Sequence, residues 1–314
     1  MATNQFSSGD VIADRRADYA RMLAESGDHA AAAELIEQAL ELAPHWAAGW
    51  SRLGEYSEKA GQTANAIAAY EKVAELDAEG IFAAPLKLAV LGAAKTPEQP
   101  PSRYVEGLFD DYADRFETSL VEKLDYSVPQ KLAALIETAK PANDKFRCIV
   151  DIGCGTGLLG SEVHAWAQRL EGFDISTNML AKAEGKGIYD HLAQADLSLE
   201  ADASGLFNAD LPHHRADLVA AADVMMYLGS LETVMPLVLG LLAPGGTFAF
   251  SVEDAGDEAG FVLMPSLRYA HSETYVRTLL TSFGLETLET QKTTIRKDAG
   301  KPLSGILFLA GKPA

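Results

Sequence analysis

The stretch "VDIGCGTGLLG", Val150 to Gly160, decides the fold. An apolar run that meets a glycine-rich turn and then a second apolar run predicts a strand, a tight turn and a helix. The glycines fit two spacings. From Gly155 the stretch is G-x-G-x-x-G, whereas from Asp151 it is an acidic residue followed by G-x-G-x-G. Both spacings let a ligand approach the backbone closely, and they predict different ligands.

On the C-terminal side of this turn, segments typical of strands alternate with segments typical of helices. The last two candidate strands are separated only by "KDAGK" (297–301), which is too short for a crossover and predicts an antiparallel hairpin. We therefore predict an α/β fold whose seven-stranded sheet is parallel except for this C-terminal hairpin. The candidate strands are 147–153, 170–176, 191–197, 216–224, 246–253, 285–296 and 302–311.

Asp151 favours the second glycine spacing. The first spacing suits NAD, whose pyrophosphate lies at a helix N-terminus and would be repelled by a neighbouring carboxylate. S-adenosylmethionine (SAM) has no phosphate and carries an ammonium and a sulfonium, which an acidic neighbour stabilises. With the Rossmann-like sheet and its hairpin, the pattern resembles class I SAM-dependent methyltransferases, and this resemblance implies SAM as cofactor and S-adenosylhomocysteine (SAH) as product.

Three further stretches carry the same resemblance: "GFDISTNMLAKA" after the second strand, "QADL" after the third, and "LLAPGGTFAFS" before the fifth. It implies that Asp174 accepts from the ribose hydroxyls, that Ile175 and Met179 pack on adenine and ribose, and that Asp196, beside the Leu197 backbone, accepts from the adenine amino group. The implied cofactor-binding residues are Tyr112, Phe116, Asp151, Gly153, Gly155, Gly157, Asp174, Ile175, Met179, Asp196, Leu197 and Asp223.

Tyr112 and Phe116 belong to "YVEGLFDDYADRFETSLVEKLDYSVPQKL" (104–132), which resembles the entrance segment of small-molecule methyltransferases. In that family a helix of this kind closes over the cofactor. The resemblance implies that Tyr112 reaches the carboxylate of SAM. The apolar spacing i, i+3, i+7 equally fits an amphipathic helix that only packs on the core.

The first ninety residues repeat themselves. "ADYARMLAESGDHAAAAELIEQALELAP" and "SRLGEYSEKAGQTANAIAAYEKVAELDA" superimpose at a shift of about 34 residues, the tetratricopeptide period. Small residues at Ala20 and Gly54 predict close helix packing, and Gly27 and Gly61 predict helix ends. The chain thus resembles bacterial methyltransferases with N-terminal tetratricopeptide repeats. We predict an all-α repeat domain over 1–95, a proline-rich linker over 96–103 and the methyltransferase domain over 104–314.

Methyl transfer needs alignment of the acceptor and exclusion of water, and a base only where the acceptor must lose a proton early. The candidates for catalysis lie at the carboxyl ends of the fourth and fifth strands: Asp223 and Tyr227, and further on His271, a possible general base near neutrality. His271 as a loop residue that only orders the next helix is an equal alternative. Glu253 and Arg268 lie in the same region, and the sequence shows no metal-ligand set.

The net charge of −19 argues against a nucleic-acid or membrane-surface partner. Two cysteines without ligand spacing, and the lack of a signal-like N-terminus or a long apolar run, predict a cytoplasmic protein. Three functions remain: a methyltransferase acting on a small molecule, which we favour; a protein methyltransferase whose repeats recruit the target; and a SAM-binding scaffold without turnover. The repeats are expected to bind a protein partner or to self-associate.

Overall fold

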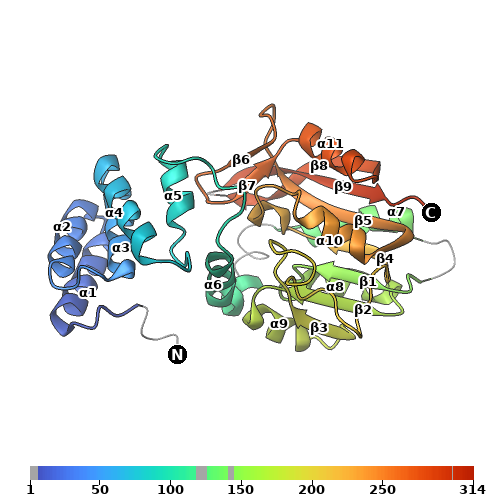
Figure 1. Cartoon of the computed structure of the whole chain (residues 1–314), viewed down its shortest axis with the longest axis horizontal. Coiled ribbons are helices and arrows are strands. Elements are labelled where there is room, and N and C mark those ends of the chain that lie inside the picture. The colour runs from blue at the N-terminus through green and yellow to red at the C-terminus, as the bar shows by residue number, and fades with distance from the viewer. Residues whose placement is uncertain (1–5, 118–125, 141–144, 299) are drawn as a thin grey trace. The chain divides into compact units, whose positions relative to one another are not determined.

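The computed structural model describes residues 6–117, 126–140, 145–298 and 300–314 (Figure 1). The chain divides into two compact units, Met1–Tyr104 and Val105–Ala314. The predicted role of residues 96–103 as a linker stays a prediction.

The first unit is helical. α1 pairs with α2, α3 pairs with α4, and α2 joins the two pairs by contacting α3. Gly27 and Gly61 follow the first helix of each pair with φ of 89° and 75°, which is the left-handed geometry that ends a helix. The helices are α1 (Val11–Glu25), α2 (His29–Leu40), α3 (Ala47–Lys59), α4 (Thr63–Leu76) and α5 (Ala84–Val90).

Small residues hold these helices close together. Ala20 and Ala32 are fully buried on the facing sides of α1 and α2. In the second pair a Cβ added at Gly54 would lie 2.5 Å from the ring of Tyr70, so only glycine fits there. The packing predicted from the repeat is therefore confirmed.

The second unit is built on one sheet, in the order β3-β2-β1-β4-β5-β7-β6 with β9 also paired to β5 and β8 to β9. β1 to β5 pair in parallel, whereas β9 runs antiparallel to both β5 and β8. The predicted Rossmann-like fold with its C-terminal hairpin is confirmed. The strands are β1 (Ile149–Ile152), β2 (Leu170–Asp174), β3 (His191–Gln194), β4 (Ala216–Ala221), β5 (Leu242–Asp254), β6 (Phe261–Leu263), β7 (Tyr269–His271), β8 (Glu286–Asp298) and β9 (Lys301–Gly311).

β6 and β7 are two strands more than the seven we predicted. β5 runs past its pairing with β4, and its last residues Glu253 and Asp254 pair in parallel with β7, which pairs with β6 in turn. These short strands lack the apolar run by which the others were found. His271, for which a loop position was one of two alternatives, lies in β7.

Helices cover both faces of this sheet (Figure 1). One core packs α10 and α11 against it through residues such as Val238 and Leu280, and the other packs α7 and α8 through residues such as Ile136 and Val163. The helices are α6 (Ser102–Tyr112), α7 (Val128–Ala139), α8 (Leu158–Val163), α9 (Thr177–Glu184), α10 (Val234–Leu241) and α11 (Glu273–Ser282).

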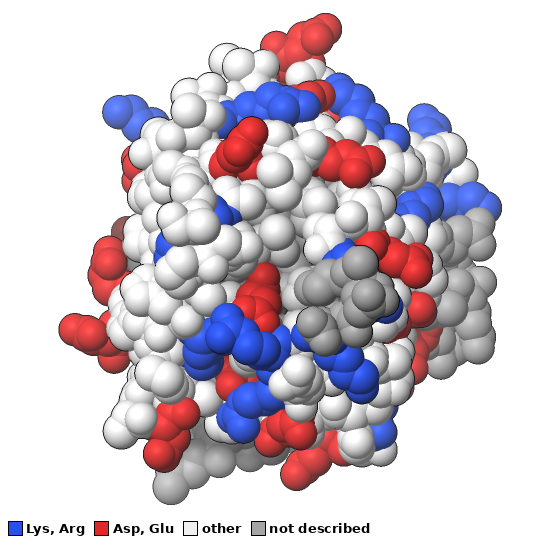
Figure 2. Space-filling model, turned by 90° about the vertical axis from the view of Figure 1, so that its right-hand side faces the viewer, with Lys and Arg blue, Asp and Glu red and all other residues white. Residues whose placement is uncertain are grey.

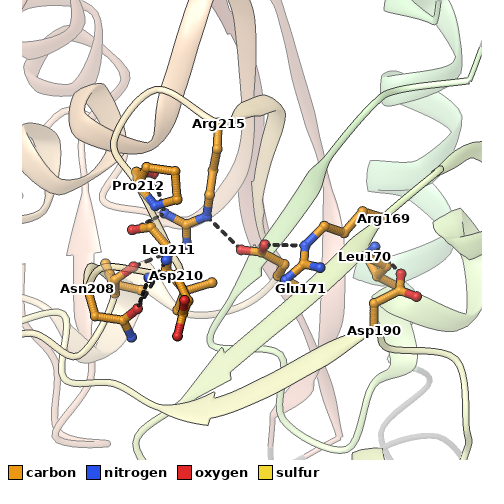
Figure 3. Close-up of polar contacts among 10 residues, drawn as sticks. Arg169, Leu170, Glu171, Asp190, Asn208, Asp210, Leu211, Pro212 and Arg215 are labelled. Carbon is orange, nitrogen blue, oxygen red and sulfur yellow. Dashed lines mark hydrogen bonds and ion pairs between the residues drawn. The ribbon is translucent and has the colours of Figure 1, made fainter.

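A buried ion cluster fixes the start of β2. The Glu171 carboxylate, 1% exposed, accepts from Arg169 Nε at 2.7 Å and from Arg215 Nε at 2.8 Å (Figure 3). Arg215 also donates to the carbonyl oxygens of Pro212 and Leu206 at 3.0 and 3.1 Å, and so holds the loop before β4. Because every partner is a charge or a backbone carbonyl within the fold, this cluster is structural.

Acidic and basic side chains are interspersed on the face of the molecule that Figure 2 displays. In the described parts of the chain, no helix has the length and apolar character needed to cross a bilayer.

Candidate functional site

The glycine turn lies at the carboxyl end of β1. Gly153, Gly155 and Gly157 have φ of 68°, 54° and 85°. A Cβ added at Gly153 would lie 2.4 Å from Val224, and one added at Gly157 would lie 3.0 Å from Tyr189. At Gly155 no described residue has an atom within 4 Å of the added Cβ. Packing inside the protein therefore requires Gly153 and is tight at Gly157, whereas Gly155 borders open space that a ligand can use.

Asp151, 1% exposed, lies beneath this turn. One carboxylate oxygen accepts from the Tyr189 hydroxyl at 2.8 Å, and the other, Oδ1, has no hydrogen-bond partner among the residues that the structure describes. Burial raises the pKa of Asp151 to about 7, although the bond from Tyr189 opposes the shift. An acceptor atom left unpaired in the interior favours a donor or a cation from a ligand.

Asp174 ends β2 and joins two turns. Its Oδ2 accepts from the Gly155 N–H at 2.8 Å and its Oδ1 from the Ser176 N–H at 2.9 Å. Burial raises its pKa to about 6, and the backbone donors oppose this. The carboxylate that the sequence assigned to the ribose thus lies directly beside the glycine that borders open space.

The entrance segment contacts the same two turns. Asp110 of α6 accepts from the Ser176 hydroxyl at 2.6 Å, and the Thr156 hydroxyl donates to Glu117 at 2.6 Å. Tyr112 and Phe116 pack edge to face, with ring centroids 5.5 Å apart, and both contact the core beside β1. The rest of the segment, 118–125, lies outside the described residues.

The remaining predicted cofactor residues follow β2 and β3. Ile175 is half-buried. One oxygen of the Asp196 carboxylate accepts hydrogen bonds from the N–H and the hydroxyl of Ser198, at 2.9 and 2.6 Å. Met179 is 0% exposed in the core and Leu197 is buried. The contact of Met179 with adenine and ribose stays a prediction.

An ionic cluster lies at the carboxyl ends of β4 and β5. Arg296 Nη1 donates to Asp223 Oδ2 at 2.6 Å, and its Nη2 donates to Glu253. Arg268 Nε donates to the same Glu253 oxygen at 2.7 Å. Asp223 has φ of 62°, an uncommon conformation for a residue with a side chain, and its N–H is held by the Ser251 hydroxyl at 2.8 Å.

Within the described part of the chain, the cluster leaves one acceptor uncommitted, because Asp223 Oδ1 is buried and has no hydrogen-bond partner there. Burial raises the pKa of Asp223, and Arg296 opposes the shift. Burial also raises the pKa of Tyr126, and the charges of both Asp223 and Asp151 raise it further. The cluster adjoins the glycine turn, because Val224, which follows Asp223 in the chain, packs against Gly153.

The sequence reasoning missed Arg296. It lies in β8, far along the chain from Asp223, and only the hairpin fold brings it to β4 and β5. The only sign of it in the sequence was a single arginine near the end of a predicted strand. Tyr227, which the sequence did select, contacts Phe109 of α6 with ring centroids 4.8 Å apart, and burial raises its pKa to about 12.

His271 is placed differently from the other catalytic candidates. It is 0% exposed, and its Nε2 lies 2.8 Å from the Gly229 carbonyl oxygen. Burial lowers its pKa to about 4, so the imidazole is neutral at physiological pH. Its ring lies beside Phe261 and Tyr275, and its role as a general base stays a prediction. The part of the chain that the structure describes holds no group of three or more His, Cys, Asp or Glu residues able to bind a metal ion.

Comparison with known families agrees with this geometry. A family model described as a methyltransferase domain matches residues 124–291, more than half of the chain. The chain belongs to this family. A tetratricopeptide-repeat model matches residues 15–45 and 47–79, so the N-terminal repeats predicted from the sequence are confirmed as well.

Curated relatives match over part of the methyltransferase. An uncharacterized methyltransferase of Mycobacterium tuberculosis is 28% identical over 117 residues, 37% of this chain and 54% of the relative. The trans-aconitate 2-methyltransferase of Delftia acidovorans is 34% identical over 36% of this chain and 40% of its own. The malonyl-[acyl-carrier protein] O-methyltransferase of Enterobacter lignolyticus is 29% identical over 40% of this chain and 44% of its own length. The chain spans about half the length of these relatives.

Solved structures share the fold. Magnesium protoporphyrin IX methyltransferase from Synechocystis, solved with bound SAH, superimposes with a TM-score of 0.50 at 16% identity and covers 67% of this chain and 99% of its own. A putative methyltransferase of Haloferax volcanii, solved with its activator Trm112, gives the same TM-score at 16% identity. The match covers 66% of this chain and 98% of that one. The second unit thus has the fold of SAM-dependent methyltransferases.

Proposed function

We propose that this protein binds SAM and transfers its methyl group to a small-molecule acceptor. The observation that carries the proposal is the glycine turn: Gly155 borders open space, its N–H is bonded to Asp174, and the buried Asp151 below it has an unpaired oxygen. SAM supplies an electrophilic methyl group on its sulfonium. The residues of the chain bind it, orient the acceptor and exclude water.

The residues present fit SAM group by group. Asp151 Oδ1 offers an acceptor to the ammonium of the methionine part, and Gly155 leaves room for that part. Asp174 offers its carboxylate to the ribose hydroxyls, and Asp196 with the Leu197 backbone lies where adenine is expected. A pyrophosphate would instead meet the Asp151 charge, so NAD is disfavoured.

The acceptor is expected beside Asp223 and Tyr227, at the carboxyl ends of the strands. Arg296 holds one oxygen of Asp223, and the other oxygen can accept a hydrogen bond from the hydroxyl or amine that is methylated. A small-molecule acceptor is favoured by the relatives named trans-aconitate 2-methyltransferase. The repeats serve as an interaction module, and the two free cysteines suit the cytoplasm.

The test is calorimetric titration of the full chain with SAM and SAH, followed by a radiolabelled-methyl assay with small acids and amines as acceptors. We expect both cofactor forms to bind. Transfer to a small molecule that is lost in Asp223→Asn would support the acceptor site. Binding without transfer to any small molecule, but with transfer to protein, would replace the small-molecule acceptor with a protein.

A further inference from the structure

α1 is apolar on two opposite sides. Its inner side is a row of alanines, Ala13, Ala17 and Ala20, all buried against the rest of the repeat unit. Its outer side carries four large apolar side chains that are exposed: Val11 at 68%, Ile12 at 57%, Tyr19 at 63% and Met22 at 57%. These four residues, with Arg15 among them, are called the outer stripe below.

The outer stripe is continuous. With 3.6 residues per turn, its five residues fall within an arc of about 100°, roughly opposite the buried alanines. A helix with an apolar stripe of this width normally packs against another element on that side. Terminal repeats of a stack usually have a polar outer face, and α1 departs from that rule.

We propose that the outer stripe binds the outer stripe of a second copy, so that two chains form an antiparallel homodimer through α1. This rests on the part of the proposed function that gives the repeats an interaction role, and it does not depend on methyl transfer. Two-fold symmetry requires one patch to complement itself, which is a strict condition on its sequence.

Four of the five residues of the outer stripe meet that condition. In an antiparallel pair centred on position 17, residues whose numbers sum to 34 lie opposite each other. Ile12 then packs on Met22 of the second copy, and Arg15 lies over the ring of Tyr19 of the second copy, a cation–π pair. The one charge in the stripe therefore meets an aromatic face rather than another apolar chain or a like charge. An unrelated peptide would have no reason to match this symmetry.

The contact is small. α1 has 15 residues and so is about 22 Å long. Two helices of this length bury less surface area than a standard protein–protein interface, unless flanking residues also take part. We therefore expect a dimer that dissociates on dilution, with a dissociation constant on the order of 10 μM.

The test is sedimentation of the full chain over a range of concentrations. The expected mass rises from 33.5 kDa to twice that value. Ile12→Glu and Met22→Glu should each weaken the dimer at least ~10-fold, because each places a carboxylate in the contact. The matched control is Leu288→Glu, since Leu288 is 50% exposed on β8 and lies outside the stripe. It should leave the dimer unchanged.

A second measurement fixes the orientation. Chains with Arg15→Cys mixed with chains with Tyr19→Cys should form a disulfide-linked mixed dimer on mild oxidation, more than either variant alone. The two natural cysteines are buried and should not interfere. A monomer at all concentrations, a dimer that survives both glutamate variants, or no preference for the mixed pair would each overturn the proposal. SAM titration of the same variants should be unchanged, which separates this outcome from a failure of the proposed function.

Discussion

Asp151→Asn should change stability and SAM binding in opposite directions at high pH. The substitution keeps the shape of the side chain and a carbonyl oxygen that can accept from Tyr189, but it removes the buried charge. In the absence of a ligand that charge destabilises the folded state, because the carboxylate is desolvated and one of its oxygens has no partner among the described residues. If SAM supplies the missing cation, the same charge contributes to binding.

The magnitude follows from the pKa of Asp151, which rises from its ordinary value of 3.8 to about 7 in the fold. The folded protein thus holds this proton more tightly than the unfolded chain. Stability from Asp151 is fully present below pH 3.8 and is lost as pH rises through about 7. Between pH 5.5 and pH 8 the loss amounts to about 2 kcal/mol in the wild type and is absent in the variant.

The assay is urea unfolding of both proteins at the two pH values, with SAM titration at pH 8. We expect the stability difference to move by about 2 kcal/mol in favour of the variant on going to pH 8. SAM affinity should fall by roughly 10- to 150-fold, the loss of a hydrogen bond to a charged group. A variant that follows the wild type at both pH values and binds SAM equally well would refute the reasoning.

Tyr189→Phe is the matched control. It removes the hydroxyl that stabilises the ionised carboxylate, so it should raise the pKa of Asp151 further. Its pH dependence should therefore shift to higher pH, opposite to the flat profile expected of Asp151→Asn.

Other substitutions test the rest of the site. Gly155→Val should abolish SAM binding while the protein stays folded, because a side chain would fill space that nothing else occupies; native affinity in calorimetry would reject the assigned register. Asp174→Ala should weaken SAM binding by about 2–4 kcal/mol, measured in the same titration, since ribose hydroxyls would lose their acceptor. Arg296→Met should destabilise the fold by about 3–5 kcal/mol in urea unfolding, because it leaves the buried Asp223 carboxylate without its ion-pair partner and leaves Glu253 with Arg268 alone; a neutral effect would show that the cluster does not need its charge. A chain that starts near Ser102 should bind SAM within about tenfold of full length, a difference of about 1.4 kcal/mol; loss of binding by a folded product would make the repeats part of the cofactor site.

The local patterns in the sequence were sufficient for the fold. The glycine turn after an apolar run, the turn before β9 and the 34-residue repeat each depend on neighbouring residues, and each has its predicted structure. β6 and β7 were missed because three-residue strands carry too little periodicity to be recognised. They join the sheet where β5 extends past β4 and pairs with β7.

The candidate site was less accessible to prediction, for two physical reasons. Arg296 becomes part of it through a long-range pairing that no local motif encodes. His271 was selected for its intrinsic pKa, yet burial lowers that pKa to about 4 and decides its behaviour. Residue type and spacing predict which groups are near the strand ends, whereas burial depends on how distant segments pack.

The central claim is that the turn at Asp151 and Gly155 binds SAM rather than a dinucleotide. The most direct measurement is calorimetric titration of the full-length wild type at pH 8 with SAM, SAH and NAD in parallel. SAM and SAH should bind at one site per chain and compete with each other, and NAD should give no heat of binding. Binding of NAD without binding of SAM would contradict the account.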